Sequence, residues 1–379
     1  MGQSEETMRD FDYFLYENND PCEMAPNAFN PRRLMNRATS AVLQAILDKP
    51  DSACAADALR GTFGTDEING LLRAGFLRED GDAIAIAFPF FVHEDAGILR
   101  AYCRHYATKL ADRLTRTLPA CRRIAGRIDN GYPEEINLYH VLCARVFDGA
   151  LFDCLSESGL VATHKRQPSG LDYILTAYEK CEALDSFSNK LLCSYNRFAD
   201  AACSLQSFGD ADGDRHDLYR FARRLEAGQT ADSEAELRRL WRALGDDARS
   251  ALLRATVSLH RTGNCAPGAR RLLEAFGYAD DRGICVPVYG ASVRSVVEEL
   301  RDTVWCAVED ELRAALTAPA MLDALACKRQ GAAQEELNNE LYHLLFGSVN
   351  EELVRRGIVA SPAYHPGEGR YLKAMELDE

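Results

Sequence analysis

The sequence contains an internal repeat, and this repeat limits the folds open to the chain more than any other feature. From Pro89 and Pro287 onward, two stretches match at a constant offset of 198 residues. In both, seven apolar residues recur at spacings of three and four, which predicts one long amphipathic helix in each copy. The matched positions are Ile98, Leu99, Tyr102, Tyr106, Leu110, Leu114 and Leu118 in the first copy and Val296, Val297, Leu300, Val304, Val308, Leu312 and Leu316 in the second.

A second pair of similar blocks follows the first pair. Leu138–Leu142 (LYHVL) resembles Leu341–Leu345 (LYHLL), and each block leads to a helix end with a glycine. A stretch that we expect to form a two-stranded ribbon comes next in both copies. Four blocks in the order A-B-A-B indicate two copies of one unit, residues 31–205 and 237–379.

Block A of the first copy has the pattern of three helices followed by a hairpin. Residues 33–49 have the apolar spacing of an amphipathic helix, and residues 53–60 are expected to form a short second helix. A third helix is expected to begin with Thr65 as its N-cap and to end at Gly75. Residues 76–88 alternate around a glycine turn, which is typical of a β-hairpin.

Three helices followed by a β-ribbon resemble a winged helix-turn-helix protein. Leu71-Leu72-Arg73-Ala74-Gly75-Phe76-Leu77 is similar to the usual exit from the recognition helix of that family. The resemblance implies a mainly α protein with small β-hairpins (α+β), in which tandem winged-helix modules are duplicated in an A-B-A-B arrangement. The expected segments are an acidic-aromatic arm (1–30), winged helix A1 with a long C-terminal helix (31–128), winged-helix-like B1 (129–205), a connector (206–236), winged helix A2 with a long C-terminal helix (237–318) and winged-helix-like B2 (319–379).

Composition and the missing motifs exclude several classes of protein. The 44 Lys and Arg against 58 Asp and Glu give a net charge of −14, which disfavours indiscriminate coating of nucleic acid. No apolar run is long enough to span a membrane and the N-terminus lacks a secretory pattern, so we expect a cytoplasmic protein. The 13 cysteines form no CxxC pair and are expected to be reduced. No catalytic, metal or cofactor motif is found, so we expect neither an enzyme nor a cofactor.

The charge on the two long helices differs between the copies. Residues 97–127 contain eight bases and one acid, whereas residues 291–316 contain three bases and six acids. The reversals include Arg100 to Glu298, Arg104 to Asp302 and Arg113 to Glu311. Either the first helix faces an anion or the two helices face each other. The apolar stripe would form an interface between repeats or between the subunits of a homodimer.

These features predict a DNA-binding transcriptional regulator, in which bases on the long helix and the wings meet phosphates. The first recognition helix argues against this function, because it begins with Asp66 and Glu67 and offers only one base. The candidate nucleic-acid-binding residues are Arg73, Arg100, Arg104, Lys109, Arg113, Lys165, Arg166, Arg270 and Arg271.

The alternative is a protein–protein interaction subunit. The chain is similar in this respect to the tandem winged-helix accessory subunits of chromosome-organising complexes, which can be acidic and which hold a partner chain with their wings and helices. The net charge and the acidic first recognition helix favour this alternative. An exposed apolar groove would support a partner protein, and a continuous basic stripe through Arg73, Arg100 and Arg166 would support DNA.

Overall fold

The computed structural model describes residues 9–17, 27–49, 53–188, 190–211, 215–226, 228, 230–317 and 319–378. Helices and small sheets alternate along the chain, so the fold is α+β as expected. The chain divides into two compact units. Unit 1 comprises Met1–Ala107, Phe152–Ser188 and Asp310–Leu345, and unit 2 comprises Thr108–Leu151, Asn189–Glu309 and Phe346–Glu379.

The compact units do not follow the six segments expected from the sequence. Unit 1 combines most of the first copy with residues 310–345 of the second, and unit 2 combines most of the second copy with residues 108–151 of the first. The physical reason is the length of the helices, since each of the longest ones contributes its two ends to different units. These helices are α6 (Ala96–Ala125), α14 (Val293–Leu316) and α16 (Gln334–Arg355).

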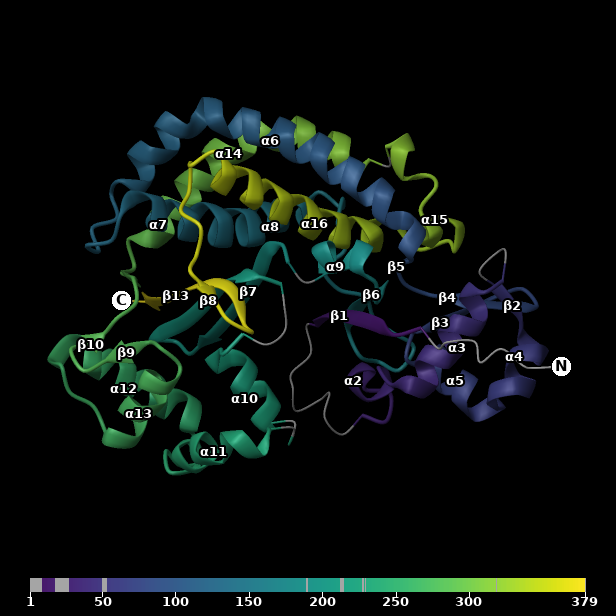
Figure 1. Cartoon of the computed structure of the whole chain (residues 1–379), viewed down its shortest axis with the longest axis horizontal. Coiled ribbons are helices and arrows are strands. Elements are labelled where there is room, and N and C mark those ends of the chain that lie inside the picture. Colours follow the sequence, from purple (N-terminus) through teal and green to yellow (C-terminus); the bar gives the residue numbers. More distant parts are fainter. Residues whose placement is uncertain are drawn as a thin grey trace. The chain divides into compact units, whose positions relative to one another are not determined.

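Unit 1 begins with a helical group that packs around a small sheet, and Figure 1 shows these elements together. The elements are α2 (Pro31–Leu34), α3 (Arg37–Leu47), β2 (Ala53–Ala55), α4 (Ala56–Phe63), α5 (Thr65–Arg73), β3 (Leu77–Asp80) and β4 (Ala83–Ile86). Their strand order is β2-β4-β3, all antiparallel. Asn36 caps α3 by accepting from the amide of Thr39 at 3.1 Å.

Three local predictions in this group are wrong. Residues 33–49 do not form one helix, because Met35 and Asn36 separate α2 from α3. Ala53–Ala55 is a strand and not the start of the second helix, because it pairs with β4. The N-cap of α5 is Gly64 and not Thr65, which is the first helical residue. Gly64 has a φ of 93°, a conformation that favours glycine and allows α4 and α5 to follow each other without a linker.

A second sheet in unit 1 corrects the expectation for residues 1–30. In the order β1-β6-β5, β1 (Phe11–Glu17) pairs antiparallel with β6 (Tyr173–Glu179), and β5 (Phe90–Phe91) pairs parallel with β6. The expected arm therefore contains a strand that pairs along its whole length. The expected B1 ribbon is present only near its tip, where Arg166 bridges Asp172 and the amide of Tyr173 donates to the carbonyl of Lys165 at 3.0 Å. The rest of its return strand, β6, pairs with β1 and β5 instead.

Unit 2 also combines helices with antiparallel strands, and its main sheet is larger than those of unit 1. Its elements are α7 (Glu134–Leu138), η2 (Tyr139–Ala150), β7 (Leu192–Ala199), β8 (Cys203–Asp210), α10 (Leu218–Glu226), α11 (Ala235–Arg242), α12 (Ala248–Thr262), α13 (Pro267–Ala275), β9 (Ala279–Asp280), β10 (Gly283–Ile284), β11 (Val288–Tyr289), β12 (Tyr364–His365) and β13 (Gly369–Leu377). The strand order is β11-β13-β8-β7, with β12 beside β13. The expected connector 206–236 is wrong, because it begins with part of β8, which is fully buried and pairs with β13 and β7.

The two copies correspond in backbone pairing as well as in sequence. Phe90 pairs with Ala177 in unit 1, and Val288 pairs with Met375 in unit 2, each 198 residues further on. In unit 1, β1 pairs antiparallel with β6, and in unit 2, β8 pairs antiparallel with β13. Each copy therefore begins with a strand, earlier than residues 31 and 237.

The helices η2 and α16 follow the long helices in the two copies. The 12-residue η2 is a π-helix, whereas α16 is a regular α-helix. The π-helix η2 leads directly into α8 (Leu151–Glu157). Among the described residues, no helix is long and apolar enough to cross a membrane.

Candidate functional site

The nine basic residues expected to bind nucleic acid do not belong to one compact unit. Unit 1 contains Arg73, Arg100, Arg104, Lys165 and Arg166, and unit 2 contains Lys109, Arg113, Arg270 and Arg271. Along α6 the four candidates form two pairs at i,i+4 spacing, and a five-residue step between the pairs turns them to different sides of the helix. The four candidate bases of α6 therefore do not share one face of the helix.

Several of these bases are engaged by acceptors of their own unit. Lys165 Nζ lies 2.7 Å from a carboxylate oxygen of Glu336. Arg270 donates to Glu274 at 2.9 Å and to the backbone carbonyls of Asp280 and Asp281 at 2.8 and 3.0 Å.

Weaker contacts engage other members of the set. Arg271 lies 3.7 Å from Glu236, and Arg100 donates to the carbonyl of Ala183 at 3.4 Å. Lys109 and Arg113 are not free either. Three of the nine bases, Lys165, Arg270 and Arg271, thus lie beside a carboxylate of their own unit.

The long helices face each other, which agrees with the second explanation of their charge reversal. In unit 2, Arg123 and Arg127 of α6 lie 3.6 and 2.8 Å from Glu299 of α14. In unit 1, the hydroxyls of Tyr102 and Tyr106 donate to carbonyls near the end of α14 at 3.4 and 3.2 Å. Most of the apolar stripe of α6 is buried within the chain, as expected for an interface between repeats and not for a homodimer.

The exposed side of α5 lines a hollow of about 460 Å³ in unit 1, formed by Phe29, Asp66, Asn69, Gly70, Leu72 and Arg73. The guanidinium of Arg73 stacks on the Phe29 ring, 5.3 Å from its centroid. Asp66 and Glu67 lie in the first turn of α5, where the helix dipole favours acids. A Cβ added at Gly70 would meet no atom within 4 Å, so the hollow is open above this residue. We name it the α5 hollow.

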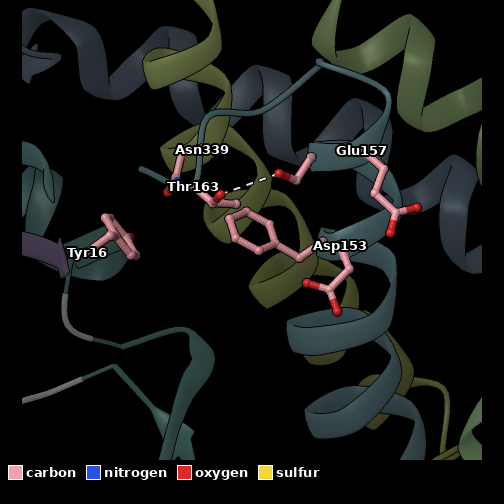
Figure 2. Close-up of a pocket in the computed structure, with 7 residues that line it drawn as sticks. Tyr16, Asp153, Glu157, Thr163 and Asn339 are labelled. Carbon is pink, nitrogen blue, oxygen red and sulfur yellow. Dashed lines mark hydrogen bonds between the residues drawn. The ribbon is translucent and has the colours of Figure 1, made fainter. Parts of the chain in front are cut away.

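A second pocket in unit 1 was not predicted from the sequence. It has a volume of about 540 Å³ and is lined by Tyr16, Phe152, Asp153, Ser156, Glu157, Thr163 and Asn339. Figure 2 shows Asp153 and Glu157 on successive turns of α8 and Tyr16 on the opposite side. We name it the acidic pocket, because the two charged side chains that line it, Asp153 and Glu157, are both carboxylates. Only the i,i+4 pair of acids could have indicated it in the sequence.

Buried ionisable groups also occur around η2 in unit 2. Arg145 of η2 forms an ion pair with Glu376, which is buried and also accepts from Gln206 at 2.8 Å. Burial lowers the pKa of His140 to about 3, and its ring stacks on Tyr289 with centroids 4.1 Å apart. These side chains are internal packing and pairing groups of the unit 2 core.

The described part of the chain contains no assembled metal site and no disulfide. No group of three or more His, Cys, Asp or Glu side chains there could hold a metal ion. The 12 described cysteines are all free thiols, and burial raises the pKa of Cys143 and Cys327. The calcium-like stretch Asp210–Asp214, which the sequence does not favour as a site, lies in part outside the described residues. Comparison of the chain with protein families, with characterised proteins and with solved structures finds no match.

Proposed function

We propose that this chain is a protein–protein interaction subunit built from duplicated winged-helix modules, and that it binds a partner protein at the α5 hollow. The observation that carries the proposal is the shape and charge of α5. A helix that reads DNA enters the major groove with a protruding, donor-rich face. The exposed side of α5 instead lines a hollow and presents an acidic first turn.

The order of elements supports the winged-helix part of the proposal. In unit 1 the chain runs α3-β2-α4-α5-β3-β4, and the short β2 pairs with β4, the return strand of the hairpin. In unit 2 three helices, α11 to α13, are followed by the small hairpin β9–β10. Three helices followed by a hairpin are the order of elements that the resemblance implies.

The state of the basic residues supports a protein partner over DNA. Non-specific DNA affinity comes from Lys and Arg that neutralise phosphates. Here Lys165 and Arg270 bind carboxylates within their own units, and Arg73 stacks on Phe29. To bind phosphate, each would first lose an internal partner.

The proposal is tested by filling the hollow. Gly70→Leu places a side chain into open space on α5, and Gly61→Leu makes the same change on α4, where an added Cβ also meets nothing within 4 Å. We expect proteins that the wild type retains from an extract of the cells that produce it, quantified by mass spectrometry, to be retained by Gly61→Leu and lost with Gly70→Leu. Equal retention by both variants would contradict binding at the α5 hollow.

DNA binding stays a second candidate, because two of the expected bases in unit 1 remain available. Arg104 and Arg166 are exposed and have no side-chain partner among the described residues. The test is fluorescence anisotropy with random-sequence duplex DNA at several salt concentrations, comparing wild type with Arg100→Glu/Arg104→Glu. Micromolar binding that weakens steeply with salt and is lost in the double variant would favour DNA. We expect no such binding.

A further inference from the structure

The acidic pocket has an excess of hydrogen-bond acceptors. Asp153 and Glu157 are exposed carboxylates with no ion-pair partner among the described residues, and no Lys, Arg or His lines the pocket. Asn339 is buried, and its Oδ1 has no hydrogen-bond partner in the described part of the chain, although its amide nitrogen donates to the carbonyl of Ala162 at 2.6 Å. Such a lining fits a ligand that is positively charged and rich in N–H donors.

Aromatic rings form another part of the pocket wall. Tyr16 and Phe152 line the pocket, and the ring of His343 lies against both, with centroids 4.8 and 5.1 Å away. Burial lowers the pKa of His343 to about 4, so this imidazole supplies no positive charge at neutral pH. Aromatic faces attract organic cations, and they stack well on a planar guanidinium.

The second copy shows what a carboxylate at this position binds. At the offset of 198 residues Asp153 corresponds to Glu351. The local backbone agrees, because the amide of Gly159 bonds to the carbonyl of Ser156 as that of Gly357 does to Val354. In unit 2 the two terminal nitrogens of Arg370 donate to the two oxygens of Glu351, at 2.6 and 3.1 Å. This is a two-point guanidinium–carboxylate pair.

The first copy lacks the internal guanidinium. Arg370 pairs across its ribbon with Tyr364, and the corresponding pair 198 residues earlier is Asp172 with Arg166. An acid therefore stands where the second copy has the arginine that binds Glu351. Partial burial, followed by the charge of Glu157, raises the pKa of Asp153, as expected for a carboxylate without a neutralising partner.

We propose that the acidic pocket binds a guanidinium group supplied from outside the chain, with Asp153 as its counter-ion and Phe152 and Tyr16 as its aromatic walls. The group belongs either to a small molecule such as arginine or to an arginine side chain of another protein. The pocket volume of about 540 Å³ accommodates an arginine-sized ligand. The proposal is independent of the α5 hollow, since it uses different residues.

The test is calorimetric titration of the whole chain with three probes: agmatine, Nα-acetyl-arginine amide, and a short peptide with one central arginine. Nα-acetyl-lysine amide is the matched control ligand. We expect saturable binding of at least one guanidinium probe with a Kd of about 1 mM or tighter. Tighter binding of agmatine assigns a small molecule, and tighter binding of the peptide assigns a protein arginine. Lack of saturable binding, or equal binding of the lysine compound, would overturn the proposal.

Three variants locate the binding site. Asp153→Asn is expected to weaken guanidinium binding by about tenfold or more, because it removes a charge-assisted pair. Asp57→Asn, an exposed carboxylate on α4 of the same unit, should leave the affinity unchanged. Asp172→Arg restores the arginine of the second copy and should compete with the added ligand. Since Asp153 is exposed, loss of folding does not complicate the result, and unchanged binding in Asp153→Asn would refute the assignment.

Discussion

Replacement of His140 by phenylalanine is expected to change how the stability of the protein depends on pH. His140 is 2% exposed, and its ring stacks on Tyr289 at an interplanar angle of 14°. Its Nε2 has no hydrogen-bond partner among the described residues. Burial, and then the charge of Arg145, lowers the pKa of this imidazole from 6.5 to about 3. The folded protein therefore holds His140 neutral where an unfolded chain would protonate it.

The sign and size of the effect follow from proton linkage. Below pH 6.5 the unfolded state binds one more proton than the folded state, so this group lowers the free energy of unfolding by about 1.4 kcal/mol per pH unit. Between pH 6.5 and 4.5 the loss amounts to about 2.7 kcal/mol. The stabilising contribution is fully present above pH 6.5 and disappears as the pH falls toward 3. Phenylalanine preserves the stacked ring and removes the titration.

Urea unfolding of the wild type and of His140→Phe at pH 7.0, 6.0, 5.0 and 4.5 measures this contribution. The difference in free energy of unfolding between variant and wild type should increase in favour of the variant by about 2.7 kcal/mol from pH 7 to pH 4.5. His260→Phe on α12 is the matched control, because His260 is exposed in the folded protein. A difference between His140→Phe and wild type that does not vary with pH would refute the reasoning.

Two further predictions concern stability in urea unfolding. Gly209→Ala should lower the free energy of unfolding by about 3 kcal/mol or more, because the added methyl group would lie 2.5 Å from the Tyr371 Cα, which cannot move aside. Gly61→Ala has open space around it and should raise the free energy of unfolding by about 0.5–1 kcal/mol. Equal effects of the two substitutions would contradict this prediction. Asp95→Ala should lower the free energy of unfolding by about 2–4 kcal/mol, because the buried carboxylate accepts hydrogen bonds from two backbone amides, one of them that of Ala326 at 3.0 Å. Asp95→Asn should cost less, since its amide oxygen can still accept, and equal losses would show that these bonds do not matter.

The sequence predicted the elements whose signal is local and missed those that depend on distant pairing. The stripe on α6 was predicted because every third or fourth residue is apolar, and the α5 to β4 segment because glycines mark its turns. The strand β1 was missed because Phe11–Glu17 carries acids and pairs with residues about 160 positions later.

The site predictions depend on information that a sequence does not carry. A row of arginines in a sequence does not show whether each faces solvent or an acid of its own chain, and Glu299 neutralises two of the bases on α6. The acidic pocket joins Tyr16, residues 152–163 and Asn339. Because these come from three distant parts of the chain, the i,i+4 pair Asp153 and Glu157 is the only local sign of the pocket in the sequence.

The composition of unit 1 has a consequence for synthesis on the ribosome. Its last segment, Asp310–Leu345, supplies Glu336 and Asn338, which bond to Lys165 and to the carbonyl of Leu160. Part of the interior of unit 1 therefore stays uncovered during synthesis until residues 310–345 have emerged from the ribosome. A ribosome stalled or terminated between the two copies would release a fragment with exposed apolar surface, which chaperones and proteases would recognise.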